Sequence, residues 1–346
     1  MSPEVYTSAQ RALELSSNQF VESMLGCNRL DSAYKFGADG EWVASNRTSF
    51  LTEDGASAPG GAEDRSESIQ KGHFFWVNTT AGFYNSQTTS QYVGFNSNSV
   101  DVAVGVQFDL GDELYAGLAL GYADINTNFT DGMSASSDGS MGEIGLSLTK
   151  FYGATKIALG VAGGYGEFDV TRGNVFTSPT SAIGDFNASY YSARLRVSHE
   201  FSFTDWYIRP FVDTAFTGIN SQSFNETGAG AMNLHVASAT YNAFTISPMV
   251  QVGREFKLGE WTIRPQASVG YSWYSSAAPS VSATLEGAPG VQGFQIYGLN
   301  DQNYFNTSGG IDLKLSNKIL FQAVYSGMFS ENTQSNNVQL KIAIPF

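Results

Sequence analysis

The sequence predicts an all-β fold, a twelve-stranded antiparallel transmembrane β-barrel with an N-terminal α-helix inside the lumen. The first observation is alternation. Over residues 72–346, large apolar residues alternate with small or polar ones in segments of about ten residues that end at turn residues. The second is composition, because charged residues make up 14% of the 346 residues, no more than aromatic residues do. Soluble domains carry about 25% charged residues, so a surface this poor in charge indicates contact with lipid.

The same composition argues against several other classes of protein. The net charge is −14, and no cluster of Lys or Arg occurs, which excludes a nucleic-acid partner. The single cysteine, Cys27, excludes an internal disulfide and a Cys-rich metal site, and we predict neither a metal nor a cofactor. No run of about 18 apolar residues occurs, so we expect no membrane-spanning helix. The first residues lack the basic start and apolar core of a signal peptide, and we expect the chain to be a fragment of a longer one.

Residues 1–30 form the first predicted unit, a polar helix that spans the pore. Ser2 is placed as an N-cap before Pro3 and Glu4, and Gly26 supplies a stop. About 23 residues at 1.5 Å each span roughly 34 Å, close to the thickness of a bilayer. The many charged, hydroxyl and amide side chains make this helix too polar to face lipid.

Residues 31–71 form a polar linker in this prediction, and residues 72–346 form the barrel. The links between strands alternate between short turns and longer polar segments near 128–140, 171–188, 221–240 and 275–302, as periplasmic turns and external loops do. The number of strands is even, as closed single-chain bacterial barrels require. The predicted strands cover residues 73–84, 92–109, 113–127, 141–151, 154–170, 189–203, 206–220, 241–257, 261–274, 303–315, 318–330 and 336–346.

The two faces of each predicted strand differ in a way that decides which one meets lipid. Val102, Val104 and Val106 alternate with Ala103 and Gly105, and other strands repeat this pattern. The outer face of a soluble sheet would carry Lys and Glu, whereas this face is small and nearly neutral. We therefore expect the apolar face to contact lipid and the small polar face to line a wet lumen.

A helix, a linker and twelve strands that end in a C-terminal Phe resemble the translocator domain of autotransporters, the type V secretion family. The resemblance covers nearly the whole chain and depends on the order and spacing of several elements. These are Trp76, Val104-Gly105-Val106-Gln107-Phe108-Asp109, Leu118-Ala119-Leu120-Gly121-Tyr122, Ile208-Arg209-Pro210, Phe224-Asn225-Glu226, Ile263-Arg264-Pro265 and Phe346.

This resemblance implies export of an N-terminal passenger, absent from this chain, and its anchoring at the bacterial cell surface. The barrel would lie in the Gram-negative outer membrane as a monomer, with its termini on the periplasmic side and the helix plugging the pore. The implied partners are outer-membrane lipid, the passenger itself and the barrel-assembly machinery. The final segment resembles the signal that this machinery recognises, and it comprises Leu340, Ile342, Ile344 and Phe346.

A polar helix in a polar lumen needs hydrogen-bond partners on the wall. Charged residues on the inward phase of the strands are the candidates, although many of them could instead pair with one another across the barrel. The candidates are Asp101, Glu143, Arg194, Arg196, Asp213, Arg264, Asp312, Lys314 and Lys341.

We predict no enzymatic activity. Some members of the family that this chain resembles cut their own passenger near an Asn of the helix. Asn18, flanked by Glu14 and Glu22, is the candidate for such a cut here. Two other functions stay open. A passive channel or porin-like barrel would give the helix no role, and an outer-membrane hydrolase would need a Ser/His or Asp/His pair at one face of the barrel.

Overall fold

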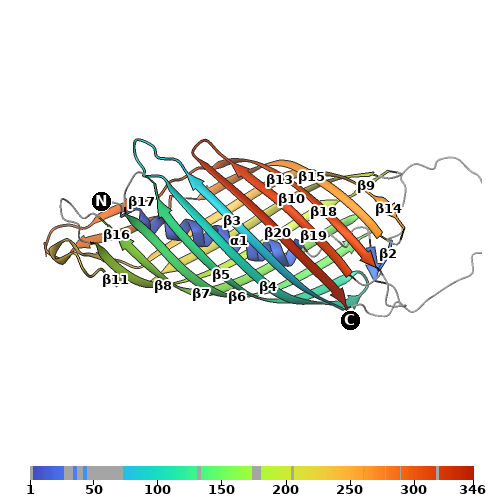
Figure 1. Cartoon of the computed structure of the whole chain (residues 1–346), viewed down its shortest axis with the longest axis horizontal. Coiled ribbons are helices and arrows are strands. Elements are labelled where there is room, and N and C mark those ends of the chain that lie inside the picture. The colour runs from blue at the N-terminus through green and yellow to red at the C-terminus, as the bar shows by residue number, and fades with distance from the viewer. Residues whose placement is uncertain are drawn as a thin grey trace, which may run out of the picture.

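The computed structural model forms a closed barrel around one helix (Figure 1). The structure describes residues 3–26, 34–36, 42–44, 73–130, 134–173, 181–203, 206–259, 261–276, 278–288, 290–316 and 319–346. Helix α1 (Val5–Gly26) lies inside the barrel and runs along its long axis. No helix among the described residues is long and apolar enough to cross a bilayer.

Twelve antiparallel strands form the wall, which confirms the predicted fold class. Each strand pairs with the next, β13 pairs with β15, and the last strand, β20, pairs with the first, β3, so that no edge of this wall is free. Closure satisfies backbone groups that would be costly to expose to lipid. The strands are β3 (Phe74–Ser86), β4 (Phe95–Gly111), β5 (Leu114–Phe129), β6 (Ala135–Tyr152), β7 (Thr155–Arg172), β8 (Ala182–His199), β10 (Trp206–Ser221), β13 (Ala239–Arg254), β15 (Trp261–Ser276), β18 (Asn303–Ser316), β19 (Ile319–Phe329) and β20 (Thr333–Pro345).

The two ends of the barrel differ. At one, which we call the turn end, the strands are joined by short links such as the turn between β4 and β5, where Gly111 adopts a φ of 87°. The strand pieces β9 (Phe201–Ser202) and β14 (Phe256–Leu258) belong to links of this end, and the C-terminus lies there (Figure 1).

The other end, which we call the loop end, holds the N-terminus and the longer links (Figure 1). The prediction of plain polar links at 221–240 and 275–302 is wrong, because they form a four-stranded sheet of β11 (Phe224–Asn225), β12 (Leu234–Val236), β16 (Ser280–Leu285) and β17 (Phe294–Tyr297), with a 3-10 turn, η2 (Gly230–Met232). Strands β6 and β8 also begin inside the expected links 128–140 and 171–188.

Two further short strands fall in the segment predicted as a linker. These are β1 (Tyr34–Phe36) and β2 (Trp42–Ala44), which pair with each other in antiparallel register. The rest of residues 31–71 lies outside the described residues, as do Ser2, the predicted N-cap, and Cys27.

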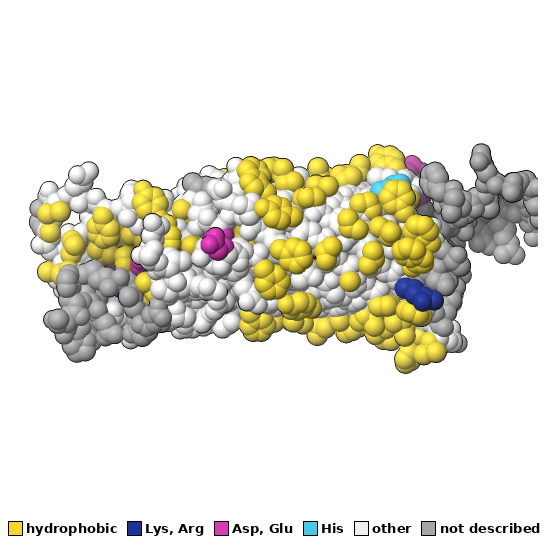
Figure 2. All heavy atoms as spheres, turned by 90° about the horizontal axis from the view of Figure 1, so that it is seen from above, with side chains coloured by type: hydrophobic (Ala, Val, Ile, Leu, Met, Phe, Trp, Pro, Cys, Tyr) yellow, Lys and Arg dark blue, Asp and Glu magenta, His cyan; other side chains and the backbone are white. Residues whose placement is uncertain are grey.

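Large apolar residues cover the outside of the barrel toward the turn end. Val102 is 42% exposed, Leu120 53% and Leu146 56%, and they point outward. Figure 2 shows apolar side chains gathered over this part of the barrel, with mostly uncoloured surface between it and the loops. An outward apolar band of this kind is the lipid-contacting surface of transmembrane barrels.

Toward the loop end the two faces exchange character. On β7, Val161 points outward and is 41% exposed, whereas Phe168 and Val170 point inward and are 2% exposed. Glu167 and Asp169 take the outward positions there. The expectation of a polar lumen along the whole barrel is therefore wrong for this end, which packs like a soluble barrel and extends past the apolar band.

Candidate functional site

The first part of the site is the packing of α1 against one side of the lumen, formed by β3 to β8 and β10. Phe20 and Met24 of α1 are 2% exposed, and small residues of the wall receive them. A Cβ at Gly121 would lie 2.6 Å from the Phe20 ring, and one at Gly145 would lie 2.5 Å from Met24. Glycine at these inward positions is what allows the helix to approach the wall so closely.

Helix residues and loop-end residues share one apolar cluster. Val5, Tyr6 and Leu13 of α1 pack there with inward residues of the loop end, including Phe186. The N-terminal half of α1 is therefore held largely by apolar burial, which is the dominant stabilising term in folded proteins.

The C-terminal half of α1 adds contacts with charged wall residues to its apolar packing, and several of these residues are the sequence candidates. Arg194 Nη1 and Arg196 Nη2, both from β8, each donate to Glu22 Oε2 at 2.7 Å. Arg196 Nε also donates to Asp213 Oδ1 of β10 at 2.6 Å, and Arg194 Nη2 donates to Asn18 Oδ1 at 3.3 Å. Two strands and one helix thus meet in a network of alternating charge.

Lys341 binds the end of the helix. Its ammonium group donates to the Ser23 carbonyl oxygen, and Nζ lies 4.2 Å from the centroid of the Trp76 ring. A cation at the C-terminus of a helix interacts favourably with the exposed carbonyl groups there. Trp76 in turn lies over Gly105, where a Cβ would come within 2.4 Å of the ring.

Two acidic candidates lie on the side of α1 that packs against the wall. The Ser16 hydroxyl donates to Asp101 of β4. Glu143 of β6 accepts from the Tyr190 hydroxyl of β8 at 2.7 Å and adjoins Phe20 at Gly121.

The other candidates, Arg264, Asp312 and Lys314, lie toward the turn end. The contacts described there are with other residues of the barrel and not with α1. Arg264 Nε lies 3.9 Å from Glu255 Oε2, and its guanidinium lies 4.8 Å from the Tyr207 ring centroid. Asp312 accepts from Gln322 at 2.8 Å, and Lys314 shares the inward side of the same strand. For Arg264 and Asp312 the structure shows pairing within the wall.

A buried cluster at the loop end contains residues that the sequence pattern does not indicate. Arg172 Nε donates to Glu226 Oε1 at 2.8 Å, and Glu226 also accepts from the Tyr6 hydroxyl and, at 2.8 Å, from the Leu234 backbone N–H. Burial, and after it the Glu226 carboxylate, raise the pKa of the Tyr6 hydroxyl well above its usual range, so Tyr6 stays a donor at neutral pH. The Phe224-Asn225-Glu226 motif is part of the family resemblance and includes Glu226. No pattern in the sequence indicates Arg172 or Tyr6 as its partners.

A second cluster of this kind surrounds Arg11. Its Nη1 donates to Glu14 Oε2 at 2.6 Å and its Nη2 donates to the Tyr304 hydroxyl at 2.9 Å. The Tyr241 hydroxyl donates to Glu14 Oε2 at 3.0 Å. The sequence predicts charged partners on the wall, whereas tyrosines serve as the partners here.

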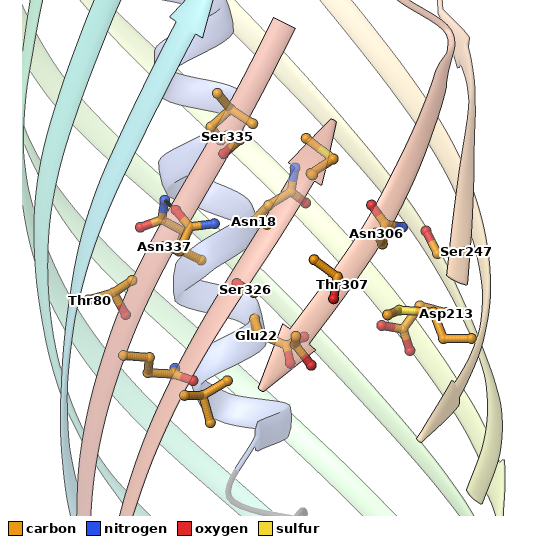
Figure 3. Close-up of a pocket in the computed structure, with 18 of the residues that line it drawn as sticks. Asn18, Glu22, Thr80, Asp213, Ser247, Asn306, Thr307, Ser326, Ser335 and Asn337 are labelled. Carbon is orange, nitrogen blue, oxygen red and sulfur yellow. Dashed lines mark hydrogen bonds between the residues drawn. The ribbon is translucent and has the colours of Figure 1, made fainter. Parts of the chain in front are cut away.

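A cavity of about 200 Å³ lies between α1 and the opposite wall. Figure 3 shows Asn18 and Glu22 at the helix, with Asn306, Ser326 and Asn337 on the strands across from it. Asn18 lines this cavity, whereas Ser16, two residues earlier and so about 200° around the helix, contacts Asp101. The described residues contain no group of three or more His, Cys, Asp or Glu that could hold a metal ion.

Comparisons with known proteins agree with this geometry. A family model described as the autotransporter β-domain matches residues 75–326. Two curated Escherichia coli relatives, the serine protease autotransporters pet and sat, are each 27% identical over 202 residues, which is 54% of this chain. The chain spans only 14% of the length of these relatives.

Solved structures show the same fold at low sequence identity. The translocator domain of the autotransporter NalP from Neisseria meningitidis matches 79% of this chain and 88% of its own, with a TM-score of 0.65 and 12% identity. The β-domain of the Bordetella autotransporter BrkA matches 80% of this chain and 100% of its own, with a TM-score of 0.60 and 13% identity. The transport unit of AIDA-I from Escherichia coli matches 82% and 93%, with a TM-score of 0.56 and 12% identity. This chain therefore belongs to the autotransporter β-domain family, whose barrels reside in the outer membrane.

Proposed function

We propose that this barrel exports a passenger that precedes α1 and anchors it at the bacterial cell surface. The observation that carries the proposal is a polar helix held inside the lumen by buried charges, with its N-terminus at the loop end. A passenger attached before Pro3 would leave the barrel at that end. In this orientation the loop end is external, and the turn end, with the C-terminus, is periplasmic.

The charges of α1 support this role, because they could not be placed in lipid. Arg11 and Glu14 are buried with each other, and Glu22 binds two arginines of the wall. The wall arginines supply the charge that Glu22 requires, so the wall is matched to this helix and not simply to water. We propose that α1 plugs the pore once export is complete.

The implied partners follow from the outer surface. Leu340, Ile342, Ile344 and Phe346 all point outward, and Phe346 is 64% exposed. We propose that this strip is read by the barrel-assembly machinery during insertion into outer-membrane lipid. The closed wall leaves no barrel strand edge for pairing with another copy, which supports a monomer.

Surface display tests the exporting role. A small protease-sensitive reporter is fused before Pro3, behind a signal peptide, and protease is added to intact cells. We expect cleavage of the reporter on intact cells, whereas a chain without β20 should leave the reporter protected. A reporter that stays protected above a correctly folded, inserted barrel would refute export.

We also propose that the barrel performs no bond-breaking chemistry. The amide oxygen of Asn18 accepts from Arg194, and Asp101 contacts the other side of the helix, so the geometry supports Asn18 as part of the plug. Mass spectrometry of the barrel purified from cells that lack surface proteases should show an unbroken chain through residues 3–26. A new N-terminus at or beside Asn18 would overturn this proposal.

The passive channel is the rival function, and the 200 Å³ cavity is the observation in its favour. Conductance in planar bilayers separates the two functions. A plugged translocator predicts a small conductance that rises strongly when residues 3–26 are deleted. An equal, large conductance with and without these residues would favour the channel.

A further inference from the structure

The space beside α1 changes size abruptly along the barrel. Between α1 and the wall of β13, β15 and β18 to β20 it forms the cavity of about 200 Å³ that Asn18 and Glu22 line. Toward the loop end, at the level of Arg11, the next cavity measures about 10 Å³. A cavity of that size holds at most one water molecule. Ions and solutes could therefore pass the level of Asn18 and Glu22 more easily than the level of Arg11.

Arg11 stands at this narrowing and reaches from the helix to the far wall. Its guanidinium donates to the Tyr304 hydroxyl at 2.9 Å and lies 5.2 Å from the Tyr274 ring centroid. Glu14, one turn along, pairs with Arg11 at 2.6 Å and accepts from the Tyr241 hydroxyl at 3.0 Å. One charge pair of α1 is thus enclosed by aromatic side chains of three strands.

Four tyrosines lie around this charge pair and form a ring with Arg11. Tyr84 comes from β3, Tyr241 from β13, Tyr274 from β15 and Tyr304 from β18, and each is at most 6% exposed. Tyr84 lines the 10 Å³ cavity together with Arg11, and Tyr274 lines the larger one. The ring therefore separates the two spaces.

We propose that Arg11, Tyr84, Tyr241, Tyr274 and Tyr304, here called the tyrosine collar, form the permeability seal of the barrel. This inference rests on the proposed plugging role of α1 and assigns that role to one level of the helix. A planar guanidinium stacks on aromatic rings while it donates to hydroxyl and carboxylate oxygens. Opening a path here would require breaking these bonds and leaving the Glu14 carboxylate buried without its partner.

The seal can be tested by conductance of the whole chain in planar bilayers. Arg11→Ala should raise the conductance several-fold above that of the unaltered barrel, yet leave it below that of the barrel without residues 3–26. Arg11→Lys retains the positive charge beside Glu14 and most of the side-chain length, and it should stay closer to the unaltered value. Gln19→Ala is the matched control. Gln19 lines the 200 Å³ cavity, outside the collar, and like Arg11 it donates from the helix to the wall, to Asn337 at 2.8 Å.

Conductance could rise in the Arg11 variant because the whole helix leaves the lumen. Substitutions of Tyr304, which lies on the wall, test the seal without altering the helix. Tyr304→Ala leaves the pair of Arg11 and Glu14 in place and should also raise conductance, whereas Tyr304→Phe should not. Unchanged conductance in both alanine variants would overturn the inference, and so would an equal rise in Gln19→Ala. A barrel that does not conduct more after deletion of residues 3–26 would instead refute the plug itself.

Discussion

Replacing Glu226 by Gln should release the four-stranded sheet of the loop end and the N-terminal turn of α1 from the barrel wall. The carboxylate accepts from Arg172, from Tyr6 and from the Leu234 N–H, and its ion pair with Arg172 is almost wholly excluded from solvent. Glutamine keeps the size but presents an amide and no charge to the guanidinium. Breaking one partner of a buried ion pair costs about 3–5 kcal/mol.

That cost sets the size of the measured effect. Each 1.4 kcal/mol changes an equilibrium constant about tenfold, so local opening of the loop-end sheet should become roughly 100-fold more frequent, or more. Amide hydrogen exchange of Leu234–Val236 in the folded, detergent-solubilised barrel reports this opening. Tyr6→Phe removes one hydrogen bond to a carboxylate, worth about 1.5–3 kcal/mol, and should show a smaller acceleration.

Glu286→Gln is the matched control for this experiment. Glu286 follows β16 of the same loop-end sheet, but it is exposed and its contact with Asn233 is 3.5 Å. Exchange should stay unchanged in this variant. Equal exchange in Glu226→Gln and Glu286→Gln would refute the view that the buried ion pair holds the helix and the sheet to the wall.

Three other substitutions test the outer face, the helix contact and the C-terminus. Leu146→Arg, on the lipid-contacting face, should lower the free energy of unfolding in liposomes by about 2–4 kcal/mol in a urea titration, and Leu146→Met should not. Gly145→Leu would occupy the space of Met24 and should make α1 sensitive to protease, whereas Gly142→Leu, on the same strand where a Cβ meets nothing within 4 Å, should leave α1 protected. Phe346→Ala should slow insertion in a pulse-chase experiment without destabilising the inserted barrel, and unchanged insertion would argue against a recognition role.

Much of the fold could be predicted because a period of two assigns every second residue to the same face. That rule does not say which face meets lipid, and the answer changes along β7. Val161 faces outward, but beyond Gly163 the apolar residues Phe168 and Val170 occupy the inward phase. The regular alternation from 154 to 170 predicts one strand, and it does not mark where the surroundings of that strand change beyond the apolar band.

The candidate site was harder to predict because it depends on how the helix is rotated in the lumen. Glycines such as Gly121 bring one side of α1 against the wall, and this places Glu22 beside Arg194 and Arg196. Arg264, an equally plausible inward charge, lies near the turn end and stacks on Tyr207 instead. Strand phase predicts that a charge faces the lumen, but only the packing of the helix decides what that charge binds.

Chemical cross-linking on intact cells tests most directly whether α1 stays in the lumen, against β4, after its passenger has reached the surface. In a barrel that displays a reporter and carries Cys27→Ser, cysteines at positions 16 and 101 replace a hydrogen-bonded pair. Cysteines at 18 and 101 are the control, because Asn18 lines the cavity on the other side of the helix. A short thiol cross-linker should join the first pair and not the second in the displayed molecules. No cross-link in either pair, or equal cross-linking in both, would contradict a docked helix.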